Sequence, residues 1–169
     1  LSDSQLGLLG GLAFAVFYTF LGIPIAALAD RRSRVKILAV SMVIWSAMTA
    51  VCGLATNFWM LLMARIGVGV GEAGASPPSH SLISDYFPID KRATALSIYA
   101  LGIPFGTMIG SYVGGWGADE LGWRYTFFLV GLPGIFVALI IALTLREPPR
   151  GLSDITPAQN AAAETAPKP

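Results

Sequence analysis

The chain has 169 residues, of which 54% are hydrophobic and 12% are charged, and its net charge at pH 7 is +1. Soluble domains carry about a quarter of their residues as charged side chains, so this composition excludes an ordinary soluble fold and predicts a membrane protein. One histidine, one cysteine (Cys52) and no basic face interleaved with aromatic residues exclude a metal site, an internal disulfide, a nucleophilic active site and a nucleic-acid surface, so we expect neither an enzyme nor a cofactor.

Five apolar stretches are long enough to cross a bilayer, because a membrane-spanning helix needs about 20 mostly apolar residues. They cover residues 6–29, 37–55, 58–83, 93–118 and 125–145. The joints between them are short, so neighbouring helices must run antiparallel. The sequence therefore predicts an all-α polytopic membrane bundle of five transmembrane helices over residues 1–150. The composition after Arg146 is rich in Pro, Ala, Thr and polar residues, which predicts a mobile tail and assigns residues 151–169 to a flexible cytoplasmic linker.

Basic residues gather at one end of this bundle, which places that end in the cytoplasm. They are Arg31, Arg32, Arg34, Lys36, Lys91, Arg92, Arg146 and Arg150, whereas the opposite end has only Arg124 near a span. This orientation puts Leu1 outside and Pro169 inside. The chain begins without methionine, and no basic region or small-residue cleavage site precedes its first apolar run. We therefore expect a fragment from which one upstream helix is missing.

The first joint contains an acid whose position needs a reason. Asp30 closes the first span, where a negative charge opposes the helix dipole, so a partner such as an arginine or another helix N-terminus would explain it. Arg31 and Arg34 have the simpler alternative of anchoring a cytoplasmic joint. Asp85 ends the third span at the same boundary, so we predict that it pairs with Arg34. Because we expect this pair to lie near water, we expect it to contribute about 0–1 kcal/mol to stability.

The third span carries two opposite charges at membrane depth. Arg65 and Glu72 are seven residues apart, two helical turns, so both project from one face with Gly69 between them. A charge there costs about 2.5–3.5 kcal/mol, and such residues commonly mark a transport pathway. A structural ion pair that locks two helices together is the alternative. Pro77 and Pro78 remove two backbone donors and should bend the cytoplasmic third of this helix.

Small residues predict where helices approach closely. In the third span, Gly67, Gly71 and Ala75 form a ridge separate from the charged face. In the fourth span, a longer ladder consists of Gly102, Gly106, Gly110 and Gly114, with Pro104 as a hinge. We expect both ridges to make tight helix contacts.

These motifs resemble those of the major facilitator superfamily. GIPIAALADRRSRVK resembles the family's cytoplasmic signature between helices two and three, with matches at Asp30, Arg31, Arg34 and Lys36 and with Ala26 and Ser33 where glycines are usual. ARIGVGVGEAG resembles the arginine-plus-glycine signature of helix four, and the later glycine ladder partly resembles the helix-five pattern of antiporters. Together with SPPSHSLISDYFP and RATALSIYALGIPFG, the chain is most similar to spinster-like transporters and their bacterial relatives, over nearly all of residues 1–150.

The resemblance implies alternating access between two six-helix halves. It implies that Glu72 titrates with protons and has Arg65 as its charge partner. It also implies a cytoplasmic gate that stabilises the outward-facing state, and we assign to this gate Asp30, Arg31, Arg34 and Asp85. The expected partners are a small-molecule solute, protons, membrane lipids, the missing first helix and the C-terminal half. We expect a proton-coupled carrier of an organic anion or amphipathic lipid-like solute in a bacterial inner membrane. The alternatives are a sugar-acid or drug transporter of the same superfamily, and a receptor or scaffold bundle that transports nothing.

Overall fold

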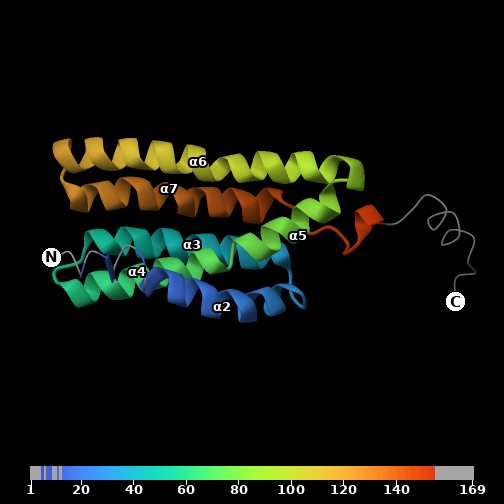
Figure 1. Ribbon diagram of the computed structural model, residues 1–169, viewed down its shortest axis with the longest axis horizontal. Helices are drawn as coiled ribbons and strands as arrows, with labels where there is room; N and C mark the ends of the chain where they lie inside the picture. The colour runs from blue at the N-terminus through green and yellow to red at the C-terminus, as the bar shows by residue number, and fades with distance from the viewer. Residues whose placement is uncertain (1–4, 6, 9–10, 12, 155–169) are drawn as a thin grey trace, which may run out of the picture.

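The structure is a computed structural model that describes residue 5, residues 7–8, residue 11 and residues 13–154. Its helices, in chain order, are α2 (Ala13–Ala29), α3 (Arg34–Gly53), α4 (Phe58–Ala73), α5 (Ser76–Tyr86), α6 (Ile89–Glu120), α7 (Trp123–Thr144) and the short 3-10 helix η2 (Leu152–Asp154). Helix α5 continues the direction of α4, and the other consecutive helices run antiparallel (Figure 1). The predicted all-α bundle is confirmed.

Four stretches are long and apolar enough to span a membrane, namely α3, the pair α4–α5, α6 and α7. The described part of α2 is shorter, and the predicted start of the first span at residue 6 lies outside the described residues. Helix α6 begins at Ile89 rather than at residue 93, because Pro88 precedes it with extended backbone and Asp90 lies in its first turn, where an acid favours a helix start.

The third predicted span is interrupted between α4 and α5. The amides of Gly74 and Ala75 bond to carbonyls three residues back, Gly71 and Glu72, at 3.1 Å each. Pro77 and Pro78 come after Ser76, in the first turn of α5, and have no N–H to offer the carbonyls of the preceding turn. The missing donors account for the break just before them.

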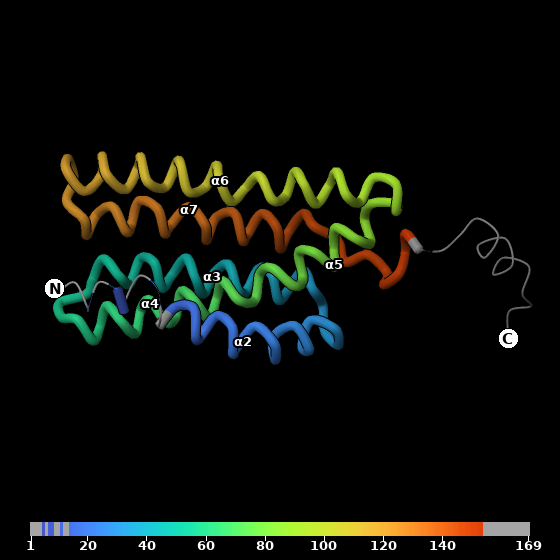
Figure 2. The backbone as a smooth tube through the Cα atoms, viewed as in Figure 1, coloured from blue at the N-terminus to red at the C-terminus, as the bar shows by residue number. Residues whose placement is uncertain are grey.

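Helix α3 is the centre of the bundle, with α7 on one side and α4 on the other (Figure 2). Both contacts depend on glycine. A Cβ on Gly71 of α4 would lie 2.5 Å from the Trp45 amide nitrogen, and a Cβ on Gly131 of α7 would lie 2.8 Å from the Ala50 amide nitrogen. Because backbone cannot move aside as a side chain can, only glycine allows these helices to come so close.

Helix α6 lies at the edge of the bundle, beside α7 (Figure 1). In α6 only Gly117 is buried, where it meets Thr126 of α7. A Cβ placed on any glycine of the predicted ladder, residues 102, 106, 110 and 114, would have no atom within 4 Å. The expected tight contact therefore has no partner among the described residues, and the ladder faces open space.

Candidate functional site

One end of the bundle holds the α2–α3 joint, the α5–α6 joint and the segment after α7 (Figure 1). This end carries most of the basic residues, and we call it the basic end. Arg34, the first residue of α3, lies there with only 1% of its surface exposed. A buried charge is costly unless it is paired and hydrogen-bonded, so its partners determine what this end can do.

Arg34 donates to two separate parts of the chain. Its Nη1 contacts the Asp85 carboxylate of α5 and lies 2.8 Å from Ser81 Oγ. Its Nε donates to Glu147 Oε1 at 2.7 Å, and its Nη2 donates to the Pro148 carbonyl at 2.8 Å. A guanidinium has five N–H donors in a fixed plane, and all three of its nitrogens are engaged here. Arg34 therefore ties α3 to α5 and to the chain beyond α7.

Glu147 holds the start of α3 from the other side. Its Oε2 accepts the Ser33 hydroxyl at 2.8 Å and the Val35 amide at 3.0 Å. Burial alone raises the pKa of Glu147, but the Val35 amide, the Arg34 guanidinium and the Ser33 hydroxyl outweigh burial, and together they lower that pKa below its ordinary value. An acid beside the first turn of a helix also faces the positive end of the helix dipole. Glu147 is therefore held as a carboxylate.

Asp85 is bound from two directions. One of its oxygens pairs with Arg34, and Oδ1 accepts the Gly151 amide at 2.9 Å. Gly151 has a φ of 71°, a left-handed conformation that glycine adopts without strain and that turns the chain back toward α5. The prediction of a mobile tail beginning after Arg146 is therefore wrong for residues 147–154, which fold against the basic end.

The structure contains the predicted pair of Arg34 and Asp85, but the premise that it lies near water is wrong. The exposed fractions of the two side chains are 1% and 9%. The third charge, Glu147, was missed because the composition of the whole C-terminal stretch resembles a linker. The signal available was an acid directly after a membrane helix at a basic end, followed by two prolines that keep the chain extended.

The other predicted gate residues stand beside this network. Asp30 and Arg31 are exposed on the α2–α3 joint. Within residues 13–154, no ion pair of either side chain is present. The partner expected for Asp30 is therefore absent from this part of the chain.

Arg65 and Glu72 are not brought into an ion pair in the part of the chain that the structure describes. Arg65 is half-buried and Glu72 is exposed, although the charge of Arg65 still acts on the Glu72 carboxyl. Gly69, between them, faces Phe14 of α2, where an added Cβ would lie 3.2 Å from the ring. The two charges therefore flank the α2–α4 contact.

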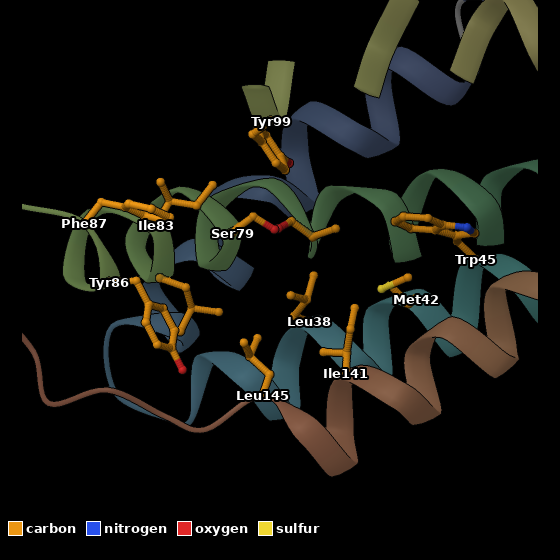
Figure 3. Close-up of a pocket in the computed structure, with 12 residues that line it drawn as sticks. Leu38, Met42, Trp45, Ser79, Ile83, Tyr86, Phe87, Tyr99, Ile141 and Leu145 are labelled. Carbon is orange, nitrogen blue, oxygen red and sulfur yellow. The ribbon is translucent and has the colours of Figure 1, made fainter. Parts of the chain in front are cut away.

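An apolar cavity of about 630 Å³ lies between α3, α5, α6 and α7. Figure 3 shows Leu38 and Met42 of α3 facing it, with Tyr86 of α5, Tyr99 of α6 and Ile141 of α7 around it. Its wall is almost wholly hydrocarbon and aromatic, so it suits an apolar group. No cluster of metal-ligating side chains is found in the described residues.

Comparisons by family model, by sequence and by structure all find relatives among membrane transporters. The family model of the Major Facilitator Superfamily matches residues 1–168. Over 145 residues the chain is 30% identical to an MFS-type efflux pump of Mycolicibacterium smegmatis, covering 86% of this chain and 34% of the pump. Over 164 residues it is 34% identical to Protein spinster homolog 1 of Homo sapiens, covering 93% of this chain and 31% of that protein.

A third relative is a sphingosine-1-phosphate transporter of Danio rerio, 33% identical over 156 residues, with 90% of this chain and 31% of that protein covered. Among solved structures, a bacterial homolog of the human lysosomal transporter Spinster, in an inward-facing and occupied conformation, is 44% identical with a TM-score of 0.79. That match covers 95% of this chain and 40% of the solved one. The chain thus spans between about a third and two fifths of the length of these relatives.

The first prediction concerns the buried pair. Asp85→Asn leaves the buried Arg34 with less compensating charge, and breaking a buried ion pair commonly costs about 3–5 kcal/mol. We expect a large fall in the free energy of unfolding, measured by thermal or denaturant unfolding of the purified protein in detergent. Asp90→Asn is the matched control, because Asp90 is exposed, and it should cost no more than about 1 kcal/mol. Equal effects of the two changes would contradict the network.

The second prediction concerns pH. Because the folded protein lowers the pKa of Glu147, its carboxylate adds stability above its ordinary pKa of 4.5, and this contribution is lost as the pH falls through the lowered value. The difference in unfolding free energy between the unmodified protein and Glu147→Gln should be constant above about pH 6 and should shrink in acid. Unfolding curves from pH 3 to pH 7 measure it, with the exposed Glu120→Gln as control. A gap that widens in acid would be the contrary result.

Proposed function

The chain belongs to the Major Facilitator Superfamily, and from this premise we propose that it is the N-terminal half, without its first helix, of a secondary active transporter. The observation that carries the proposal is the match to the bacterial spinster homolog, which covers 95% of this chain at 44% identity but only 40% of that protein. Transporters of this kind alternate between two states by rocking one half against the other. The activity therefore requires the rest of a longer protein.

The open side of α6 supports the proposal that further helices pack here. A membrane helix normally buries a face against its neighbours, yet α6 buries only Gly117, and a Cβ on any glycine of its ladder would have no atom of the described residues within 4 Å. The apolar cavity also lies beside α6, whose Tyr99 lines it together with residues of α3, α5 and α7 (Figure 3). We propose that the first helix of the complete transporter fills this face, and that the C-terminal half, the solute and protons complete the working protein in a bacterial inner membrane.

We propose that the joint of Asp30, Arg31 and Arg34, together with Asp85, forms a cytoplasmic gate. The buried pair of Arg34 and Asp85 holds α3 and α5 as one body, so this pair is unsuited to break at every turnover. Asp30 is different, because it is exposed and makes no ion pair among the described residues. Its carboxylate can therefore meet the second half when the cytoplasmic side closes, and this contact would favour the outward-facing state.

We further propose that Glu72 carries the coupling proton and that Arg65 modifies the proton affinity of Glu72. Low dielectric favours the neutral acid, whereas a nearby cation favours the carboxylate. The two charges do not form an ion pair here, so a change in their separation or in water access can change proton affinity. Proton binding that differs between two states shifts the balance between them, which coupling requires.

The relatives support a proposal for the solute class. Spinster relatives include a sphingosine-1-phosphate transporter, which favours an amphipathic or organic-anion solute. The similarity to an MFS-type efflux pump favours drug export as the second candidate. Uptake of a lysolipid, a sphingoid phosphate and an amphipathic drug into proteoliposomes that contain the full-length protein, with and without a pH gradient, separates the two. No uptake of any solute under any gradient would favour a bundle that does not transport.

The third prediction tests the proton site. In the full-length protein, Glu72→Gln should retain solute exchange but lose accumulation driven by a pH gradient, because the amide cannot titrate. Arg65→Ala should impair both more strongly, because it removes the cation that acts on the acid. Glu120→Gln, an exposed acid at the far end of α6, is the matched control and should behave as the unmodified protein. Accumulation by Glu72→Gln with unchanged pH dependence would assign the proton site elsewhere.

A further inference from the structure

The segment after α7, residues 146–153, crosses the basic end and touches four helices. We call it the strap. The Tyr86 hydroxyl of α5 donates to the Arg146 carbonyl, and the Gly151 amide donates to Asp85. The Ser153 hydroxyl bonds to the Ser84 carbonyl and also accepts from Arg92 of α6 at 2.8 Å. With Glu147 on the start of α3, the strap reaches α3, α5 and α6.

The fourth helix that the strap reaches is α2, through Arg150. Its Nη2 donates to the Ala29 carbonyl at 2.7 Å and to the Arg32 carbonyl at 3.1 Å. The last carbonyls of a helix have no partner inside that helix and form the negative end of its dipole. The Arg150 guanidinium satisfies one of them, the carbonyl of Ala29, the last residue of α2. It also offsets the unfavourable charge of Asp30, the residue directly after α2.

The α2–α3 joint is consequently held at both ends. At its start, Arg150 binds the carbonyls on either side of Asp30 and Arg31. At its end, Ser33 accepts the Lys36 amide, which caps α3, and donates its hydroxyl to Glu147. Between these anchors the Asp30 amide bonds to the Ala26 carbonyl at 3.1 Å, and the Asp30 side chain remains exposed. The strap thus fixes the backbone that carries Asp30 without covering its carboxylate.

We propose that Arg150 is a positioning residue of the cytoplasmic gate, acting through the Ala29 and Arg32 carbonyls to hold Asp30 where the second half can meet it. This inference rests on the gate described under the proposed function. Arg150 itself touches neither the solute nor the second half. Loss of the Arg150 side chain lets the α2–α3 joint move. Asp30 then contacts the second half less often, and the outward-facing state becomes less stable.

The test measures the ratio of inward- to outward-facing molecules in the full-length protein. Spin-label distances between Lys91→Cys and a label at the facing end of the second half report this ratio. Asp30→Asn should shift it toward the inward-facing state. Arg150→Ala should shift it the same way by about two- to fivefold, the range for a cation at a helix C-terminus. The double variant should match Asp30→Asn alone, because Arg150 acts through Asp30.

Arg146→Ala is the matched control. It removes the same charge from the same strap, but the Arg146 side chain is exposed and makes no hydrogen bond or ion pair within residues 13–154, so the ratio should not change. Unfolding temperatures check that each variant is folded. If Arg150→Ala does not fold, Arg150→Lys replaces it in the same cycle, and a smaller shift that also vanishes with Asp30→Asn is expected.

The outcomes separate the two proposals. If Asp30→Asn shifts the ratio but the Arg150 variant leaves it unchanged, or adds its full effect on top of Asp30→Asn, the positioning role is overturned and the gate stands. An equal shift by Arg146→Ala also overturns the positioning role, because it makes the effect one of net charge. If Asp30→Asn shifts nothing, the gate itself fails, and the role of Arg150 fails with it.

Discussion

A guanidinium with 1% of its surface exposed constrains the whole basic end of this protein. Water cannot solvate Arg34, so the chain must bring it acids and carbonyls, and it does so from α5 and from the segment after α7. Each partner is then fixed in turn: Glu147 by the start of α3, and Asp85 by the Gly151 amide. One buried charge thereby joins parts of the chain that are more than a hundred residues apart.

Glycines at the helix contacts allow the helices to pack closely enough for this arrangement to form. Gly71 and Gly131 let α4 and α7 approach the backbone of α3 from opposite sides, which places the start of α3 between α5 and the end of α7. The described bundle is nevertheless open along α6. A well-packed group of helices at one end and an open side along α6 are compatible with the proposal that this chain is part of a larger transporter.

The sequence predicted those features of the fold that depend on a short stretch of residues or on one membrane boundary. Apolar length predicted the spans, and two opposite charges at one membrane boundary predicted the pair of Arg34 and Asp85. Burial of that pair could not be foreseen, because it depends on the strap, and an average over a Pro- and Ala-rich stretch concealed Glu147. The glycine ladder of α6 shows a different limit, since small residues predict that a helix can approach but do not say which one. The roles of Glu72 and Arg65 remain predictions, because the structure describes one arrangement of these side chains and tests neither role.

The central claim is that Arg34 and Asp85 form a buried pair on which the basic end depends. A double-mutant cycle with Arg34→Met, Asp85→Asn and the double variant measures it most directly, from unfolding free energies in detergent. The account predicts that each single change is strongly destabilising and that the double change costs less than their sum by about 2 kcal/mol or more. Effects that add within about 0.5 kcal/mol would show two independent side chains and would contradict the account.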